Sequence, residues 1–136
     1  MKKIIQITLF FALLVAPIQI KAQLDTLQYL KKFEVEKAEY VNKPFSYLLG
    51  QMTKIQPKSV WYLPQINRKS KVIVSEFVYC KKEYSFHNVI KLYITWESEI
   101  PRSEIEYYQK KNAFYFTNDE RQFYGNKIVK NIEVVR

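Results

Sequence analysis

The sequence predicts an α+β fold, with N-terminal helices packed on an antiparallel sheet of about four strands and a further helix before the last strand. Two runs rich in β-branched and aromatic residues, Lys71–Cys80 and Val89–Glu97, flank a short polar segment, which is typical of a β-hairpin. Apolar residues recur at helical spacing ahead of this hairpin, and helix-start signals follow it. Because the connections are short, one α+β domain over residues 23–136 is expected.

The hairpin is the best-defined element of this prediction. In its second run apolar residues alternate with more polar ones, so one face of the strand is apolar; that face consists of Ile90, Leu92, Ile94 and Trp96. A two-stranded hairpin is marginally stable alone and needs further strands or a covering helix. We therefore expect the rest of the chain to cover the apolar face.

Two helices are predicted before the hairpin. The first spans Leu24–Tyr40, and its residues at helical spacing are Leu24, Leu27, Leu30 and Phe33. The second opens at Pro44, and its apolar face consists of Phe45, Leu48, Leu49 and Met52. A short strand, Ser59–Leu63, follows between Pro57 and Pro64, and the prolines favour a position at the edge of the sheet.

The chain beyond the hairpin carries several signals of helix boundaries. Two pairs have the spacing of a capping box, in which each residue's side chain satisfies a free backbone N–H of the other: Ser103 with Glu106, and Thr117 with Glu120. Gly125 is predicted to adopt the left-handed conformation beyond the second of these helices. Lys127–Val135 is predicted as the last strand, and the type of the apolar piece Ala113–Phe116 stays open.

Residues 1–22 are predicted to be a secretory signal peptide. Two lysines follow Met1, an apolar run covers residues 4–16, and the segment ends at Ala22, after which cleavage is expected. The apolar run is shorter than the roughly 20 residues that a membrane-spanning helix needs, so no transmembrane segment is expected. We predict a periplasmic or secreted protein.

Basic residues concentrate in the middle of the chain. Without the predicted signal peptide, 19 Lys and Arg face 13 acidic residues, a net charge of +6. Residues 54–82 alone carry seven of these bases against Glu76. Such a segment can attract an acidic protein, a glycan or an anionic lipid, although solubility and protection of the sheet edges explain lysines equally well. Export argues against a nucleic-acid partner, and the oligomeric state stays undetermined.

Aromatic residues are the second unusual feature of the composition. Twenty of the 22 follow the predicted signal peptide, more than a small core buries. Tyrosine and tryptophan are favoured at interfaces because a broad ring carries a polar tip. The surplus rings expected from the sequence are Tyr79, Tyr84, Phe86, Tyr93, Tyr107, Tyr108, Phe114, Tyr115, Phe123 and Tyr124. The residues predicted to contact a partner are Trp61, Arg68, Lys69, Lys71, Lys81 and Lys82.

Catalytic and metal-binding patterns are weak in this sequence. One histidine, His87, and one cysteine, Cys80, cannot supply a clustered zinc site, and no cofactor motif is present. Cys80 ends an apolar strand, which predicts a buried, inert thiol and no intramolecular disulfide. Glu97 and Glu99 alternate on one strand and are the best candidates for a carboxylate-dependent reaction.

Several segments resemble short exported proteins of unknown function from Bacteroidota. The segments are the end of the leader, Lys21-Ala22-Gln23, and the stretches Lys43–Leu49 and Pro57–Trp61, in a chain rich in Lys, Ile, Asn and Tyr. The resemblance implies a location in the cell envelope and assigns a role to no residue.

The sequence therefore favours an exported, non-catalytic module that binds a macromolecular partner in the cell envelope. Two alternatives stay open. One is a small envelope hydrolase that uses carboxylates, and the other is an inhibitor or an immunity-type protein.

Overall fold

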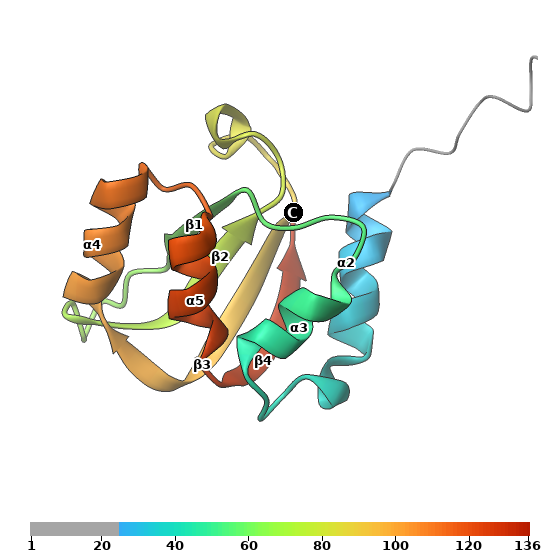
Figure 1. Ribbon diagram of the computed structural model, residues 1–136, viewed down its shortest axis with the longest axis horizontal. Coiled ribbons are helices and arrows are strands. Elements are labelled where there is room, and N and C mark those ends of the chain that lie inside the picture. Colours follow the sequence, from blue (N-terminus) through green and yellow to red (C-terminus); the bar gives the residue numbers. More distant parts are fainter. Residues whose placement is uncertain (1–24) are drawn as a thin grey trace, which may run out of the picture.

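The computed structural model describes residues 25–136, so the predicted signal peptide lies outside the described residues. Four helices and four strands follow one another along this part of the chain. Figure 1 shows α3 and α5 lying across one face of the sheet, with α2 beside β4 and α4 at the opposite side. This arrangement confirms the predicted α+β class and the helix that precedes the last strand.

The sheet is antiparallel and its strands lie in sequence order. They are β1 (Ser59–Tyr62), β2 (Lys71–Val78), β3 (Lys91–Pro101) and β4 (Val129–Val135). The predicted hairpin is present, with Phe77 opposite Leu92 and Ser75 opposite Ile94. β3 runs four residues beyond the predicted end at Glu97 and begins after Ile90.

The helices are shorter than the sequence suggested but lie where it placed them. They are α2 (Thr26–Val35), α3 (Phe45–Gln51), α4 (Arg102–Asn112) and α5 (Asn118–Gly125), with short 3₁₀ turns η2 (Lys37–Glu39) and η3 (Lys82–Tyr84). The predicted first helix ends early because a 3₁₀ turn follows its Ccap residue, Glu36. Within residues 25–136, no helix has the length and apolar character needed to span a lipid bilayer.

The core lies between the sheet and the helix layer. The alternating residues Leu92, Ile94 and Trp96 of β3 are all buried, as their spacing predicts. Rings from three other elements surround Trp96: Phe45, Phe77 and Tyr124. The Trp96 indole N–H donates to the buried Ser75 hydroxyl at 2.9 Å, which satisfies the polar atom of the largest core side chain.

Two predicted helix boundaries are wrong and one is confirmed. Thr117 and Glu120 form the capping box of α5. Ser103 does not cap α4, because the helix begins one residue earlier, at Arg102, whose backbone N–H donates to Ser70 O. Gly125 is the last residue of α5 and has no left-handed φ, since the chain turns into β4 through residues with negative φ.

Other segments of the chain pair with β1 at one edge of the sheet and with the first residue of β4 at the other. Along β1, Val60 N donates to Phe114 O and Phe116 N donates to Lys58 O, so the segment Ala113–Phe116 lies against this strand. Along β4, Val129 exchanges backbone hydrogen bonds with Asn42 and Lys43. These contacts remove free edge donors and acceptors that would pair with another chain.

Candidate binding surface

The five basic residues among the six predicted contact residues lie in two groups at opposite ends of β2. β2 separates Arg68, Lys69 and Lys71 at its start from Lys81 and Lys82 beyond its end. Eight strand residues rise about 3.3 Å each, so the two groups are about 25 Å apart. Each group therefore has to be considered separately.

In the group at the start of β2, Arg68 is the one side chain with an ion pair within residues 25–136, and Lys69 and Lys71 make backbone contacts. The Arg68 guanidinium forms an ion pair with Glu99. Lys69 contributes its backbone carbonyl to the Arg102 guanidinium at 3.4 Å, and Lys71 pairs with Pro101 across the sheet. The Arg68–Glu99 pair offsets one charge of this group.

The group beyond the end of β2 lies in a shallow groove, which we call the lysine groove. Its volume is about 480 Å³, and its lining is Pro57, Lys58, Lys81, Lys82, Glu83, Tyr115 and Phe116. The Lys82 ammonium donates to Ala113 O at 2.9 Å and lies 4.6 Å from the centre of the Tyr115 ring. Within residues 25–136, Lys58 and Lys81 have no carboxylate at ion-pair distance.

An aromatic cluster adjoins the lysine groove, and we call it the Trp61 cluster. Trp61 stacks on Phe114 with ring centres 4.3 Å apart, and Phe86 meets Trp61 edge-on at 5.4 Å. Strand alternation places Trp61 on the face opposite that of the buried Val60. Phe86 is 82% exposed, so the cluster ends in a large apolar surface in contact with solvent.

The segment that joins the groove to the cluster has an unusual backbone. Ala113 and Phe114 have φ angles of 51° and 68°, in the left-handed region that residues other than Gly and Asn rarely occupy. The conformation costs roughly 1–2 kcal/mol for each residue with a Cβ. Hydrogen bonds from Phe114 N to Gln109 O and from Tyr115 N to Asn112 O hold the turn.

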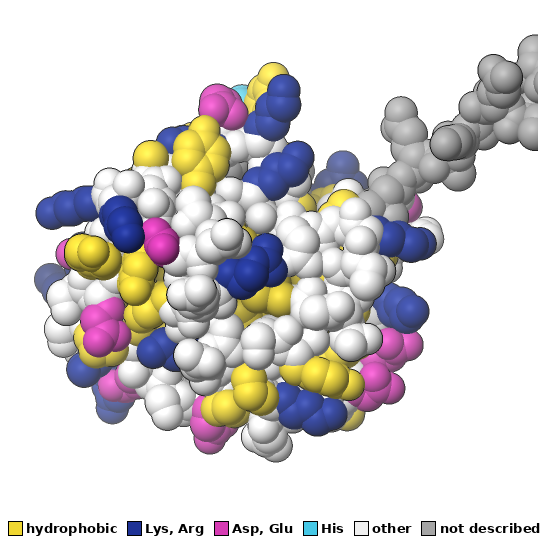
Figure 2. Space-filling model, viewed as in Figure 1, with side chains coloured by type: hydrophobic (Ala, Val, Ile, Leu, Met, Phe, Trp, Pro, Cys, Tyr) yellow, Lys and Arg dark blue, Asp and Glu magenta, His cyan; other side chains and the backbone are white. Residues whose placement is uncertain are grey.

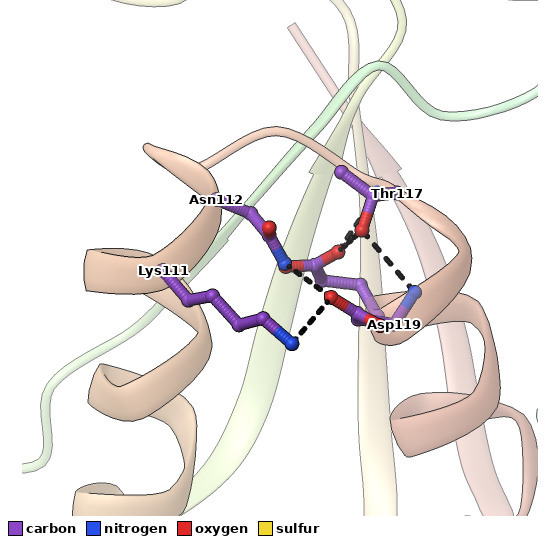
Figure 3. A network of polar contacts seen from close by, with 5 residues as sticks. Lys111, Asn112, Thr117 and Asp119 are labelled. Atoms are coloured by element: carbon purple, nitrogen blue, oxygen red, sulfur yellow. Dashed lines mark hydrogen bonds and ion pairs between the residues drawn. The ribbon is translucent and has the colours of Figure 1, made fainter.

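A network of polar side chains fixes both ends of this segment (Figure 3). Asn112, the last residue of α4, donates to Glu120 Oε1 at 2.7 Å and to Asp119 Oδ2 at 3.1 Å, and Lys111 pairs with Asp119 at 3.1 Å. Glu120 also accepts from Thr117 N at 2.8 Å and is 1% exposed. The hydrogen bond from Asn112, followed by the charge of Lys111, lowers the pKa of Asp119.

The residues considered for catalysis are separated or otherwise engaged. Glu99 pairs with Arg68, whereas Glu97 is exposed within β3, where its backbone N–H donates to Ile128 O. His87 lies in the β2–β3 loop beside the Tyr84 ring. Cys80, predicted to be buried, is partly exposed, because β2 ends at Val78 and Cys80 already belongs to the loop. No group of three or more His, Cys, Asp and Glu with metal-binding geometry occurs between residues 25 and 136.

Three of the six contact residues predicted from the sequence belong to this surface. Trp61, Lys81 and Lys82 were predicted contact residues and do line it or adjoin it. Lys58 was counted in the basic segment but not selected, and Phe86 and Tyr115 appeared only among the surplus rings. The one signal in the sequence that points to Phe86 and Tyr115 is the large number of aromatic residues. No family model, curated protein or solved structure matches this chain.

Proposed function

We propose that the chain is an exported, non-catalytic binding module of the cell envelope, and that it holds an anionic macromolecule at the lysine groove. The signal-peptide pattern of residues 1–22 supports export to the periplasm or beyond. Lys58, Lys81 and Lys82 come from two separate segments and line one groove, which supports a partner with negative charge. Glu83 is the single carboxylate among the residues that line the groove, so the groove keeps a net positive charge that attracts an added anion.

The aromatic side chains beside the lysines supply the second part of the recognition. Tyr115 is 42% exposed and lies under the Lys82 ammonium, so its ring and the charge face the groove together. Aromatic rings contribute contact area with little loss of conformational entropy, and lysines add charge that raises the association rate. A partner with alternating charged and apolar parts fits such a surface.

Charge reversal with a matched control tests this function. Lys81→Glu and Lys58→Glu are expected to weaken binding to the soluble polyanions poly-L-glutamate and polygalacturonate by about fivefold or more each, because each replaces an attraction with a repulsion. Lys69→Glu makes the same charge change about 25 Å away and is expected to have a smaller effect. Affinity is measured by fluorescence titration at low and moderate salt.

Two outcomes would contradict the proposal. One is that the protein binds none of these polyanions, nor anionic vesicles, even at low salt. The other is that Lys69→Glu weakens binding as much as Lys81→Glu does, since net charge rather than the lysine groove would then govern the interaction. All three variants change exposed lysines, so the fold is expected to be retained, and circular dichroism checks this.

A further inference from the structure

The β2–β3 loop presents an apolar tip that neither the core nor the lysine groove uses. Figure 1 shows this loop, which contains η3, projecting from the body of the protein at the end where the C-terminus lies. Phe86 is 82% exposed and Tyr84 is 55% exposed. Figure 2 shows hydrophobic and basic side chains gathered on this projection. A single exposed ring is ordinary, but two exposed rings two residues apart on a projecting loop make a candidate contact surface.

The loop is built to hold that tip in place. Backbone N–H groups of Tyr84, Ser85 and His87 each donate to the carbonyl three residues earlier, at 2.9–3.0 Å. The Ser85 hydroxyl is buried and donates to Lys82 O at 2.6 Å, so Ser85 points inward while Phe86 points outward. Phe86 also touches the edge of Trp61. An ordered turn therefore displays the Phe86 ring.

Positive charge surrounds the base of the tip. Lys81 and Lys82 precede it directly, and Lys58 contributes from the start of β1, against the single carboxylate of Glu83 in the same groove. Glu83 Oε1 accepts from the Tyr115 hydroxyl at 3.4 Å. At the other side of the base, Arg136 lines a pocket with Asn88 and Val89.

We propose that this end of the protein docks on an anionic lipid surface, with Phe86 entering the interfacial layer and the three lysines contacting lipid phosphates; the inference rests on the proposed function and names its partner. Peripheral membrane sites combine an apolar or aromatic tip with basic residues at its base, because each lysine near an anionic leaflet contributes to binding and aromatic rings favour the interface.

The shape of the surface favours lipid over a glycan or an acidic protein. The exposed apolar part is a projection, which a deformable lipid interface accommodates, whereas small ligands are bound in concave sites. Trp61, the residue best suited to stack on a sugar, has one face covered by Phe114 at 4.3 Å. The lysine groove beside the tip then provides the place for phosphate headgroups.

Vesicle sedimentation tests this inference. The processed protein, recovered from the periplasm with its N-terminus confirmed by mass spectrometry, is mixed with vesicles of phosphatidylcholine alone or with phosphatidylglycerol. Binding is expected only to the anionic vesicles. Phe86→Ala is expected to reduce the affinity on the order of tenfold through lost apolar contact. Tyr107→Ala, which removes a ring on α4 that is 59% exposed, is expected to leave the affinity unchanged. Insertion is measured as the blue shift and the quenching by brominated lipid that Phe86→Trp shows beyond the emission of Trp61 and Trp96 in the unsubstituted protein.

The outcomes separate this inference from the function on which it rests. Binding to polygalacturonate or poly-L-glutamate without binding to anionic vesicles overturns the lipid inference and leaves the proposed function standing. Vesicle binding that is insensitive to Phe86→Ala, with no quenching at position 86, shows that the tip does not insert and overturns it as well. Failure to bind any of these probes overturns both.

Discussion

Replacing Ala113 with glycine is expected to stabilise the protein. Ala113 follows the last residue of α4 and has φ 51° and ψ 42°, the left-handed conformation in which helices commonly end. Glycine is the usual residue there, because it has no Cβ to clash with the backbone. The Ala113 methyl group is exposed, and the contact that the residue makes with Lys82 uses its carbonyl oxygen, which glycine keeps.

The size of the effect follows from two opposing contributions. The left-handed conformation costs an L-residue roughly 1–2 kcal/mol, and glycine removes this cost. Glycine also loses more chain entropy on folding, by roughly 0.5–1 kcal/mol relative to alanine. The free energy of unfolding should therefore rise by about 0.5–1 kcal/mol, which corresponds to a Tm increase of a few degrees for a domain of this length.

The chain offers a matched control in Ala38. This residue is also exposed, lies in η2, and is absent from the residues with positive φ. Ala38→Gly should lower the free energy of unfolding by about 0.5–1 kcal/mol, since only the entropic contribution applies. Urea unfolding monitored by circular dichroism measures both variants. Equal destabilisation by Ala113→Gly and Ala38→Gly would refute the left-handed conformation at the end of α4.

Two further predictions concern the core and the edge of the sheet. Ser75→Ala leaves the Trp96 indole N–H buried without its acceptor, so urea unfolding should show a loss of about 1–3 kcal/mol, whereas Ser98→Ala, at an exposed position, should lose less than about 0.5 kcal/mol. Burial alone would raise the pKa of Glu34, but the hydrogen bond from Val134 N–H and neighbouring lysines hold it below its ordinary value. A carboxylate whose pKa is lower in the folded state stabilises the fold at pH values above its unfolded-state pKa, and this stabilisation is lost as the carboxylate is protonated in acid. The difference in free energy of unfolding between the protein and Glu34→Gln should therefore shrink as pH falls below about 4. A difference that does not change with pH would contradict this.

The sheet was predictable because its signals are local and repeat along the chain. Alternation at Leu92, Ile94 and Trp96 fixes which face of β3 is buried without any knowledge of the neighbours. The capping box of Thr117 and Glu120 is equally local. The pair Ser103 and Glu106 has the same spacing and still fails, because β3 pairs as far as Pro101 and Ser70 O already satisfies the first helical N–H. A tertiary contact there replaces the cap.

The binding surface was less predictable because its parts meet only through tertiary contacts. The residues of the Ala113–Phe116 segment lie more than 50 positions from β1, and no sequence pattern relates Phe114 to Trp61. The division of the basic residues, in contrast, follows from the sequence alone: an extended strand over Lys71–Cys80 separates Arg68 from Lys82 by a distance no single patch spans. The six predicted contact residues were therefore never able to form one contiguous site.

An NMR titration of the backbone amides is the most direct test of the lysine groove as the binding site. Short-chain phosphatidylglycerol and a soluble polyanion are added in separate titrations to the isotope-labelled protein. If an anion binds in the lysine groove, the largest chemical-shift changes should fall in residues 57–61, 80–88 and 113–116. With the lipid, the amide of Phe86 should show one of the largest changes. Changes concentrated in residues 66–71 and 102–108, or spread evenly over the surface, would contradict it.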